Sequence, residues 1–598
     1  MKHENIADIY KLTPIQQGIL FHSLYTPTSG VYFEQFSWTL NQEWVVPVFA
    51  RAWQYVVDQH PILRTAFFWE DLDEPMQMVQ RQARLPFIEL DWSDLSPAEQ
   101  ETQLEIYLQR DREQGFDLTE APLMRVTVIR GGPETFHIVW SYHHLLLDGW
   151  SVPLVIQDVF AAYSAMLQGQ APRLSRRRPY RDYLSWLRRQ DLDEAQSYWR
   201  RILQGFTTRT PLPVDHGAGR SGTAHAYDKS QILLSPEQTE ALQTLARQER
   251  LTLSTLVHGA WALLLRAYSG ERDLVFGTTV SGRPADLAGS ETMVGCFINT
   301  LPLRVQAQAE QSLRDWLLAL QQRQAELRQY AYSPLVDVQR WSDVPPGERL
   351  FESIVVFENY PTEAFEESGL RIFQQTNYPL TLVAVPRRSL TLRIGYETRH
   401  FDPGTIERLL AQLQALLEDM LDGLDRPLRD IGLMTEAERH TLLVEWNATA
   451  AAYPQDACLH TLIEQQAART PDAVAVVFEA QQLTYAQLNA RANQLAHHLR
   501  SLGVAPEQRV AVCLPRSADL LVGLLAILKA GGAYLPLDPN YPAARLQFML
   551  QDAAPVVVLT EARVADRLPA TTAQVLVLDR AWPTIAACAT SNPDAARA

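Results

Sequence analysis

The residues with the clearest chemical potential lie together in the stretch Tyr142–Ser151, which reads YHHLLLDGWS. Two adjacent histidines, His143 and His144, are followed after three apolar residues by Asp148 and Gly149. Histidine has an unperturbed pKa near ~6.5, so it can accept or donate a proton around neutrality. Asp148 and Gly149 are typical turn residues. Spacing alone favours a structural role for these histidines, and two of them without a third ligand make a weak metal site.

The elements around the two histidines decide where each ring can point. The β-rich runs Met124–Arg130 and Thr135–Tyr142 flank a Gly-Gly-Pro turn, which predicts a hairpin. If the second strand continues through His143, successive side chains point to opposite faces, and at most one of His143 and His144 can face a given cavity. The apolar residues Leu145–Leu147 are expected to anchor the following loop in the core.

A coarse pattern of further elements predicts two α+β lobes, residues 1–175 and 176–440. The basic run Pro172–Pro179 is expected to join them as a linker, and a second linker is expected over 441–457. Beyond it, strands alternate with helices, which predicts a parallel α/β sheet over 458–598. The expected helices are Leu12–Tyr25, Val48–Gln59, Tyr180–Phe206 and Leu251–Ala267, and the expected strands include Leu63–Trp69, Leu274–Val280, Phe351–Phe357 and Leu390–Tyr396.

Composition narrows the classes of partner and compartment. The 598 residues carry a formal net charge of −16, and an acidic chain is a poor general partner for nucleic acid or an anionic membrane. Four scattered cysteines fit a reducing compartment. No apolar run approaches the roughly 20 residues that a membrane span needs. These features predict a cytoplasmic, multi-domain protein that is a monomer.

The stretch HHLLLDG resembles the HHxxxDG signature of the condensation domains of non-ribosomal peptide synthetases, a superfamily similar to chloramphenicol acetyltransferase. Other family motifs have counterparts in the expected order, although Gln59 and Pro61 depart from the second motif. The counterparts are Leu12–Leu24, His60–Phe67 (HPILRTAF), Tyr180–Trp186 (YRDYLSW), Val294–Arg304 (VGCFINTLPLR), Tyr332–Pro334 and Phe351–Pro361. The resemblance covers roughly 440 residues and implies a pseudo-dimeric, two-lobed fold.

The resemblance also implies a reaction and a site. Two carrier domains, one upstream and one downstream, would each present a substrate as a 4'-phosphopantetheine thioester, and the acceptor's amine would attack the donor's thioester carbonyl. His144 matches the family's catalytic histidine, with His143 beside it, and either a general base or a positioning role stays open. Asp148 is expected to pair with Arg283 and hold the loop, and Gly149 to place a backbone N–H near the reacting centre or to serve only as a turn residue. The domain would bind no cofactor or metal of its own.

Finer features point to a subtype and to a further partner. Within the family, HHLLLDGWS, LFHSLY and the segment Val356–Pro361 (VFENYP) resemble the class that joins a D-configured donor to an L-configured acceptor. The opening residues ENIADIYKLTP resemble a docking segment for an upstream synthetase, and a frayed tail is the alternative. The basic stretch Arg176–Arg178 is one place where an acidic carrier domain could dock, with a solvated linker as the alternative. Trp150 and Trp186 are expected in the core rather than against substrate.

The last part of the chain resembles the start of an adenylation domain. Leu483–Leu488 (LTYAQL) and Leu528–Asp538 (LKAGGAYLPLD) match two of that family's patterns, with Gln487 in place of a glutamate. The phosphate-gripping loop, the later core motifs and the catalytic lysine loop do not occur in this sequence. The fragment is therefore expected to be inactive, since ATP and magnesium would bind only to a complete adenylation domain.

Two other functions remain open for the same motif. An epimerisation domain shares HHxxxDG, but it would follow a carrier domain, whereas an adenylation start follows here. A non-catalytic member of the superfamily that only recruits carrier domains is the second alternative, and the intact motif weighs against it.

Overall fold

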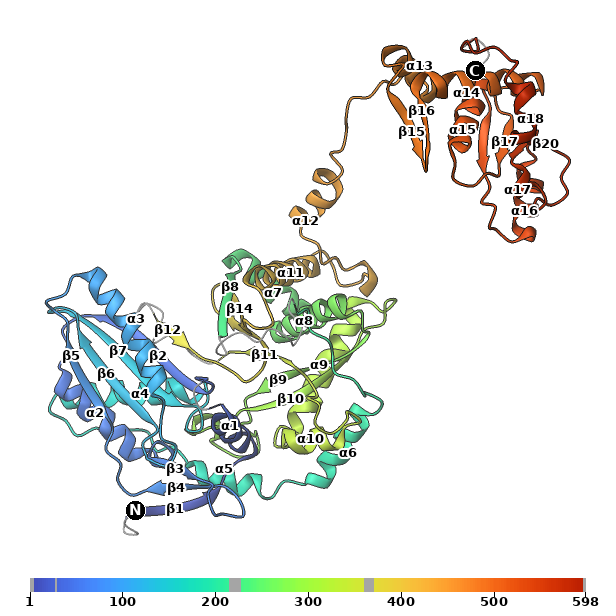
Figure 1. The fold of residues 1–598 in the computed structure, drawn as a ribbon. Helices are drawn as coiled ribbons and strands as arrows, with labels where there is room; N and C mark the ends of the chain where they lie inside the picture. The colour runs from blue at the N-terminus through green and yellow to red at the C-terminus, as the bar shows by residue number, and fades with distance from the viewer. Residues whose placement is uncertain (1–4, 27–28, 215–226, 360–369, 595–598) are drawn as a thin grey trace. The chain divides into compact units, whose positions relative to one another are not determined.

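The computed structural model describes residues 5–26, 29–214, 227–359 and 370–594. The chain divides into two compact units, Met1–Trp446 and Asn447–Ala598, each with its own hydrophobic interior (Figure 1). The first unit holds two separate cores, one for each lobe. No helix in the described ranges is both long and apolar enough to cross a membrane.

A five-stranded sheet forms the centre of the first lobe. Its strand order is β12-β2-β7-β6-β5. The predicted hairpin is confirmed, because β6 and β7 pair antiparallel and β7 runs through His143. The helices α2 and α4 pack on one face through the lobe's core, and α3 covers the other (Figure 1). The bounds are β2 (Phe33–Asn41), β5 (Phe87–Asp91), β6 (Met124–Arg130), β7 (Thr135–His143), β12 (Arg371–Phe373), α2 (Val46–Gln59), α3 (Pro97–Gln114) and α4 (Ser151–Leu167).

A small sheet with the strand order β1-β4-β3 lies beside the five-stranded sheet. It excludes one alternative for the opening segment and differs from one predicted strand. β1 (Ile6–Lys11) pairs antiparallel with β4 (Met76–Gln80), so the described part of the opening segment is a sheet strand and not a frayed tail. The strand expected over Leu63–Trp69 is shorter, β3 (Thr65–Phe68), because a single 3-10 turn that starts with a proline precedes it. The helix α1 (Pro14–Tyr25) is capped by the side chain of Thr13 and has a proline in its first turn.

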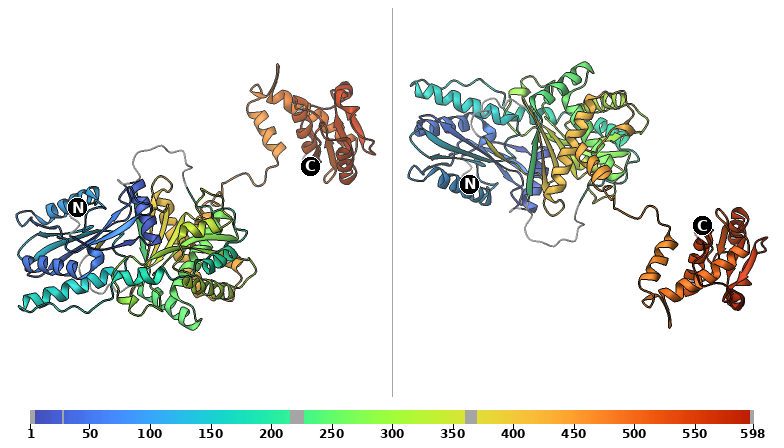
Figure 2. Two further views of the ribbon diagram at one scale, coloured as in Figure 1. Left: turned by 90° about the horizontal axis from the view of Figure 1, so that it is seen from below. Right: turned by 90° about the horizontal axis from the view of Figure 1, so that it is seen from above.

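The second lobe is built on a six-stranded sheet with the order β10-β9-β11-β13-β14-β8. β11 is parallel to both of its neighbours, and the remaining pairs are antiparallel. Figure 2 shows the two lobes of this unit side by side. The bounds are β8 (Tyr227–Leu233), β9 (Asp273–Val280), β10 (Asn299–Gln306), β11 (Ser353–Phe357), β13 (Leu380–Pro386), β14 (Leu390–Glu397), α7 (Pro236–Gln248), α8 (Leu253–Ser269), α9 (Leu313–Gln329), α10 (Leu335–Trp341) and α11 (Pro403–Leu421).

The connection between the lobes differs from its prediction in two ways. The single helix expected over Tyr180–Phe206 is two helices, α5 (Tyr180–Leu187) and α6 (Leu192–Leu203), because Asp191 caps the second one through the backbone N–H groups of its first turn. The basic run before α5 is not simply solvated, since Arg177 forms a largely buried ion pair with Asp158 at 2.8 Å.

The second unit contains the predicted parallel sheet. β17 pairs parallel with β18 and β19, and β19 with β20, while β15 and β16 form a separate hairpin. Before this unit, α12 (Glu436–His440) continues into a π-helical turn, Thr441–Glu445. The bounds are β15 (Val474–Phe478), β16 (Gln481–Thr484), β17 (Arg509–Val512), β18 (Ala533–Pro536), β19 (Val557–Thr560), β20 (Gln574–Val577), α13 (Leu459–Arg469), α14 (Tyr485–Ser501), α15 (Ala518–Ala530), α16 (Ala543–Ala553), α17 (Ala562–Ala565) and α18 (Leu578–Ile585).

Candidate active site

A cavity between the two lobes contains His144 and Gly149. Its empty volume is about 1340 Å³, and its walls come from α1, β2 and the loop after β7 in the first lobe and from several strands of the second lobe. Two further cavities adjoin it. One shares Val280, Ser281 and Phe357 with it, and the other shares Lys229 and Arg393. The cavity that His144 lines therefore adjoins both of the others.

His144 occupies the position immediately after β7 and is fixed by its backbone. Its N–H donates to the carbonyl of Tyr32 at 2.9 Å, and the Tyr32 ring meets the imidazole edge-on at 6.1 Å. Nδ1 is buried and finds no hydrogen-bond partner in another described residue. Burial lowers the pKa of His144 below its ordinary value, and the Asp148 carboxylate acts in the opposite sense. A neutral ring beside the cavity can accept a proton.

His143 is turned away from this cavity, as strand alternation predicts. Its Nδ1 accepts a hydrogen bond from the backbone N–H of Leu145 at 3.3 Å. The proton therefore sits on Nε2, which donates to Oγ of Ser23 on α1 at 3.2 Å, and that hydroxyl donates to the carbonyl of Ile19. Burial, with a smaller contribution from His144, lowers the pKa of His143 to about 3. His143 is thus a neutral group that ties β7 to α1.

Asp148 is fully buried and holds the loop to the second lobe. One of its oxygens accepts hydrogen bonds from the backbone N–H of Ser151 at 2.8 Å and from Arg283 at 3.1 Å, and the other accepts from the N–H of Phe297 at 3.1 Å. The guanidinium of Arg283 also donates to the carbonyls of Ser290 and Met293. With its oxygens engaged in this way, Asp148 makes no hydrogen bond to His144.

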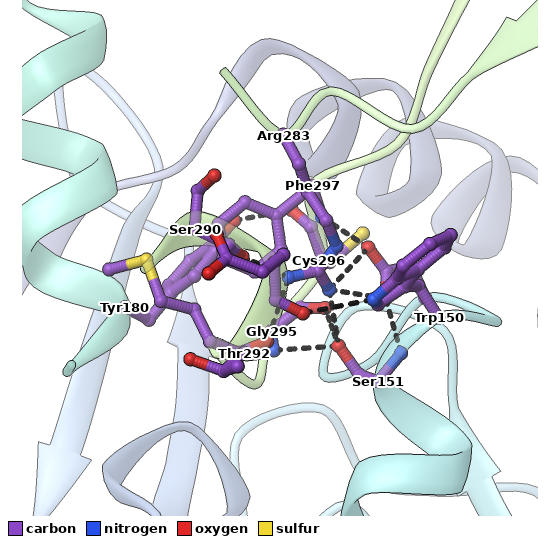
Figure 3. A network of polar contacts seen from close by, with 12 residues as sticks. Trp150, Ser151, Tyr180, Arg283, Ser290, Thr292, Gly295, Cys296 and Phe297 are labelled. Carbon is purple, nitrogen blue, oxygen red and sulfur yellow. Dashed lines mark hydrogen bonds and ion pairs between the residues drawn. The ribbon is translucent and has the colours of Figure 1, made fainter. Parts of the chain in front are cut away.

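The loop that follows β9 closes around the start of α4 (Figure 3). Ser151 Oγ donates to the carbonyl of Gly295 at 2.8 Å and accepts from its N–H at 3.0 Å. The Arg283 guanidinium lies over the Phe297 ring at 4.1 Å. Position 295 has no room for a side chain, because a Cβ on Gly295 would lie 2.3 Å from the ring of Tyr180. This network binds the loop bearing Asp148 to the second lobe.

The two tryptophans of this region are only partly buried, and Trp186 packs against the cores of both lobes. Trp150 is only half-buried and lines the cavity of His144, with its indole N–H donating to the carbonyl of Glu291. Trp186 is also half-buried and lines the adjoining cavity, where its indole N–H donates to Asp286. Strand and helix patterns signal burial but not whether a large aromatic side chain faces a core or a cavity.

The other motifs mainly build the frame around the cavity. His60 Nε2 contacts Asp158 at 2.9 Å, which joins the second motif to α4 and to Arg177. Asn299 donates from its amide to the carbonyls of Ala331 and Ser333, so two distant motifs are held together. Residues Tyr360 and Pro361 of the predicted subtype segment lie outside the described residues.

Sequence reasoning missed two residues that bear on the site. Gln16, within the first motif, is fully buried and donates to the carbonyl of Leu145 at 2.9 Å, which supports the turn after His144. Glu34 on β2 is 2% exposed and lines the same cavity as His144. Its position in the alternating strand Phe33–Asn41 could have flagged a buried charge. Within the described parts of the chain, no group of three or more His, Cys, Asp or Glu side chains is placed to hold a metal ion.

This two-lobed fold, with His144 of the histidine pair at a cavity between the lobes, is that of a known family of domains. The family described as "Condensation domain" matches residues 6–443, and the family described as "AMP-binding enzyme" matches residues 463–597. The chain therefore belongs to the condensation-domain family of non-ribosomal peptide synthetases, and the N-terminal part of an AMP-binding domain follows.

Its relatives are large synthases named for linear gramicidin and other peptides. The chain is 48% identical to one of the linear gramicidin synthase proteins of Brevibacillus parabrevis, over 99% of this chain and 12% of that protein. Bacitracin synthase 1 of Bacillus licheniformis is 35% identical over 93% of this chain and 11% of its own length. The chain thus spans about an eighth of the length of such relatives.

Solved structures agree on the fold. The AMPPNP-bound form of the non-ribosomal peptide synthetase FmoA3 matches with a TM-score of 0.77 at 23% identity, over 99% of this chain and 61% of that one. The first condensation domain of the calcium-dependent antibiotic synthetase, in complex with a substrate analogue, matches with a TM-score of 0.61 at 18% identity, over 72% of this chain and all of that one. At these identities the likeness concerns the fold.

Proposed function

We propose that the first unit forms an amide bond between a donor acyl or peptidyl thioester and the amine of an acceptor aminoacyl thioester, each carried on a phosphopantetheine arm. The observation that carries this proposal is that His144 lines a cavity between the lobes, and that two further cavities adjoin this cavity. Two thioesters that enter from different sides can meet in this cavity. A thioester is already activated, so bringing the two ends together supplies much of the rate.

His144 acts on the attacking nitrogen. The acceptor arrives as an ammonium and must lose one proton before its lone pair can attack. As the N–C bond forms and the C–S bond breaks, the nitrogen loses a second proton to His144, and this proton passes to the departing thiolate. The lowered pKa of His144 keeps the ring neutral at pH 7 and ready for that step. Asp148 and Arg283 hold the loop, and Gly149 lines the cavity beside the reacting atoms.

The partners of the reaction are two carrier domains, one upstream and one downstream. Support comes from the family match and from relatives whose names describe peptide synthases many times longer than this chain. We propose the D-donor, L-acceptor subtype on the sequence pattern around HHLLLDGWS. The described part of the opening segment forms β1, and its role in docking to an upstream synthetase stays a proposal.

A reconstitution with defined carriers tests this function. A donor carrier is loaded with a dipeptidyl group that ends in a D- or an L-residue, and the native chain and an aminoacyl acceptor carrier are added. Mass spectrometry should show amide product from the D-terminal donor, and His144→Ala should reduce its rate by about 10²-fold or more. Absence of product with every donor, or full rate in His144→Ala, would overturn the proposal. Inversion of the donor's α-carbon without amide formation would indicate epimerisation instead.

The second unit is proposed to make no aminoacyl adenylate by itself. The sequence Leu528–Asp538 supplies a helix end, a turn and the strand β18, which are structural parts of the AMP-binding fold. Amino-acid-dependent exchange of pyrophosphate into ATP should stay at background for this chain with every amino acid offered. Exchange above background for any amino acid would contradict this assignment.

A further inference from the structure

A second titratable side chain faces the cavity of His144, and it lacks the partners of an ordinary buried carboxylate. Glu34 lies on β2, is 2% exposed and lines this cavity. Its Oε2 is buried and makes no hydrogen bond within the described structure. A buried polar atom left unsatisfied costs about 1–3 kcal/mol in proteins, so such an atom in a cavity calls for an explanation.

A second buried carboxylate on the same lobe shows what a purely structural acid looks like here. Asp111 on α3 is 5% exposed and accepts hydrogen bonds from Arg125, from the amide of Gln35 at 2.6 Å and from Ser141. Both of its oxygens are satisfied, and a guanidinium balances its charge. Glu34 is one residue from Gln35 on the opposite face of β2 and has neither property.

The groups around Glu34 leave its carboxyl available near neutrality. Gln374 hydrogen-bonds to it and Glu358 adds a like charge, yet burial dominates and raises the pKa of Glu34 to about 8. The two cationic side chains that line the cavity come from β8 and β14. Lys229 donates to the carbonyl of Ile372 at 2.8 Å, and Arg393 is the other. Glu34 can therefore gain or lose a proton at a pH at which an aminoacyl amine also does so.

We propose that Glu34 binds the amino group of the acceptor substrate and accepts the proton that its ammonium form must lose before attack. This assignment rests on the proposed function. The step is balanced: an ammonium and a carboxylate become a neutral amine and a carboxylic acid, and burial favours the uncharged pair. His144 then handles the second proton, which leaves the nitrogen as the amide forms. Glu34 keeps this proton after the reaction, and the next ammonium that binds displaces it to solvent.

The proposal predicts proton release when the acceptor binds. Free Glu34 carries a proton at pH 7, so binding of an ammonium ligand should release close to one proton. The probe is the aminoacyl pantetheine amide of the amino acid that condenses fastest, or of alanine if none condenses. Calorimetric titration of the full chain in two buffers with different ionisation enthalpies counts the protons. The same ligand with its amine acetylated should release none.

Glu34→Gln supplies the decisive comparison, because it keeps the shape of the side chain but cannot accept a proton. This variant should release no proton on binding, and its condensation rate at pH 7 should fall by about 10²-fold. The deficit should shrink as pH rises to 9, since the amine then loses its proton unaided. Glu89→Gln, on the exposed part of β5 in the same sheet, should match the native chain in both measurements.

The outcomes separate this proposal from the proposed function. Equal proton release in Glu34→Gln and the native chain, or a rate deficit that does not change with pH, would overturn the role of Glu34. A native chain that releases a proton on binding but makes no amide with any donor would instead overturn the condensation function. A thermal unfolding midpoint of Glu34→Gln equal to that of the native chain shows that the fold is retained, and Glu34→Asp should partly restore proton release if the fold is lost with glutamine.

Discussion

Two adjacent histidines of identical type acquire opposite roles from their surroundings. Both ring nitrogens of His143 form hydrogen bonds, to Leu145 and Ser23, whereas Nδ1 of His144 forms no hydrogen bond with another described residue and its ring borders the cavity. Burial keeps both rings uncharged. The sequence distinguishes them only through strand alternation, which requires that the two rings face different ways.

The pH dependence of condensation should report the environment of His144. Its neutral form is the active one, and its pKa lies below the ordinary value of 6.5 because of burial. Activity should therefore persist through pH 6.5 and decline only as the pH falls further and the ring takes up a proton. A profile of kcat against pH with carrier-bound substrates measures this. This expectation would be contradicted if the native chain lost rate with a midpoint above pH 6.5 and His144→Ala did not show the same loss.

At the scale of elements, the ion pair of Asp148 and Arg283 should be costly to break from one side. Asp148→Asn would leave the Arg283 guanidinium buried, with a side-chain exposure of 5%, and without its counter-charge. We expect the free energy of unfolding of the first unit to fall by about 3–5 kcal/mol. Urea unfolding followed by tryptophan fluorescence measures the change.

The double variant Asp148→Asn with Arg283→Met is the control for this pair. It removes the stranded charge, so it should be less destabilised than the sum of the two single variants. Simple addition of the two single losses would show that the pair does not act as a unit.

The close approach of the loop after β9 to α5 should make Gly295 intolerant of a side chain. In Gly295→Ala, the new Cβ would lie 2.3 Å from the Tyr180 ring, and neither the ring nor the backbone can yield cheaply. Overpacking of this kind costs about 1–3 kcal/mol. Gly404→Ala in α11, where nothing lies within 4 Å, should be neutral or stabilising. Equal midpoints for the two variants in thermal unfolding would contradict the expected clash.

Periodicity and turn residues predicted most elements of the fold but not every contact between them. The cap at Thr13, the hairpin of β6 and β7 and the parallel sheet of the second unit depend on local signals. The opening strand β1 was missed because its pairing with β4 spans about 70 residues of sequence. Glu34 was missed because a lone acid in a strand becomes informative only when its neighbours fail to neutralise it.

At the scale of the whole molecule, the segment between the two units should be the first site of proteolysis. Trp446 is 70% exposed and Tyr453 is 69% exposed, and no regular structure covers residues 448–454. Brief treatment with chymotrypsin should give two stable fragments that meet near these residues. Replacement of both aromatics by serine should delay this cleavage. Early cuts inside either unit, before any here, would contradict the division into two units.

The short strand β12 has a consequence for engineered hybrids of this domain. It lies between β11 and β13 in sequence, so it belongs to the second lobe's chain segment, yet it pairs with β2 of the first lobe's sheet, and its Arg371 contacts Glu101 and Glu105 on α3. A chimera that joins the first lobe of one synthetase to the second lobe of another therefore imports a foreign edge strand. A chimera that keeps this strand pairing must take β12 and the first-lobe residues that face it from the same synthetase.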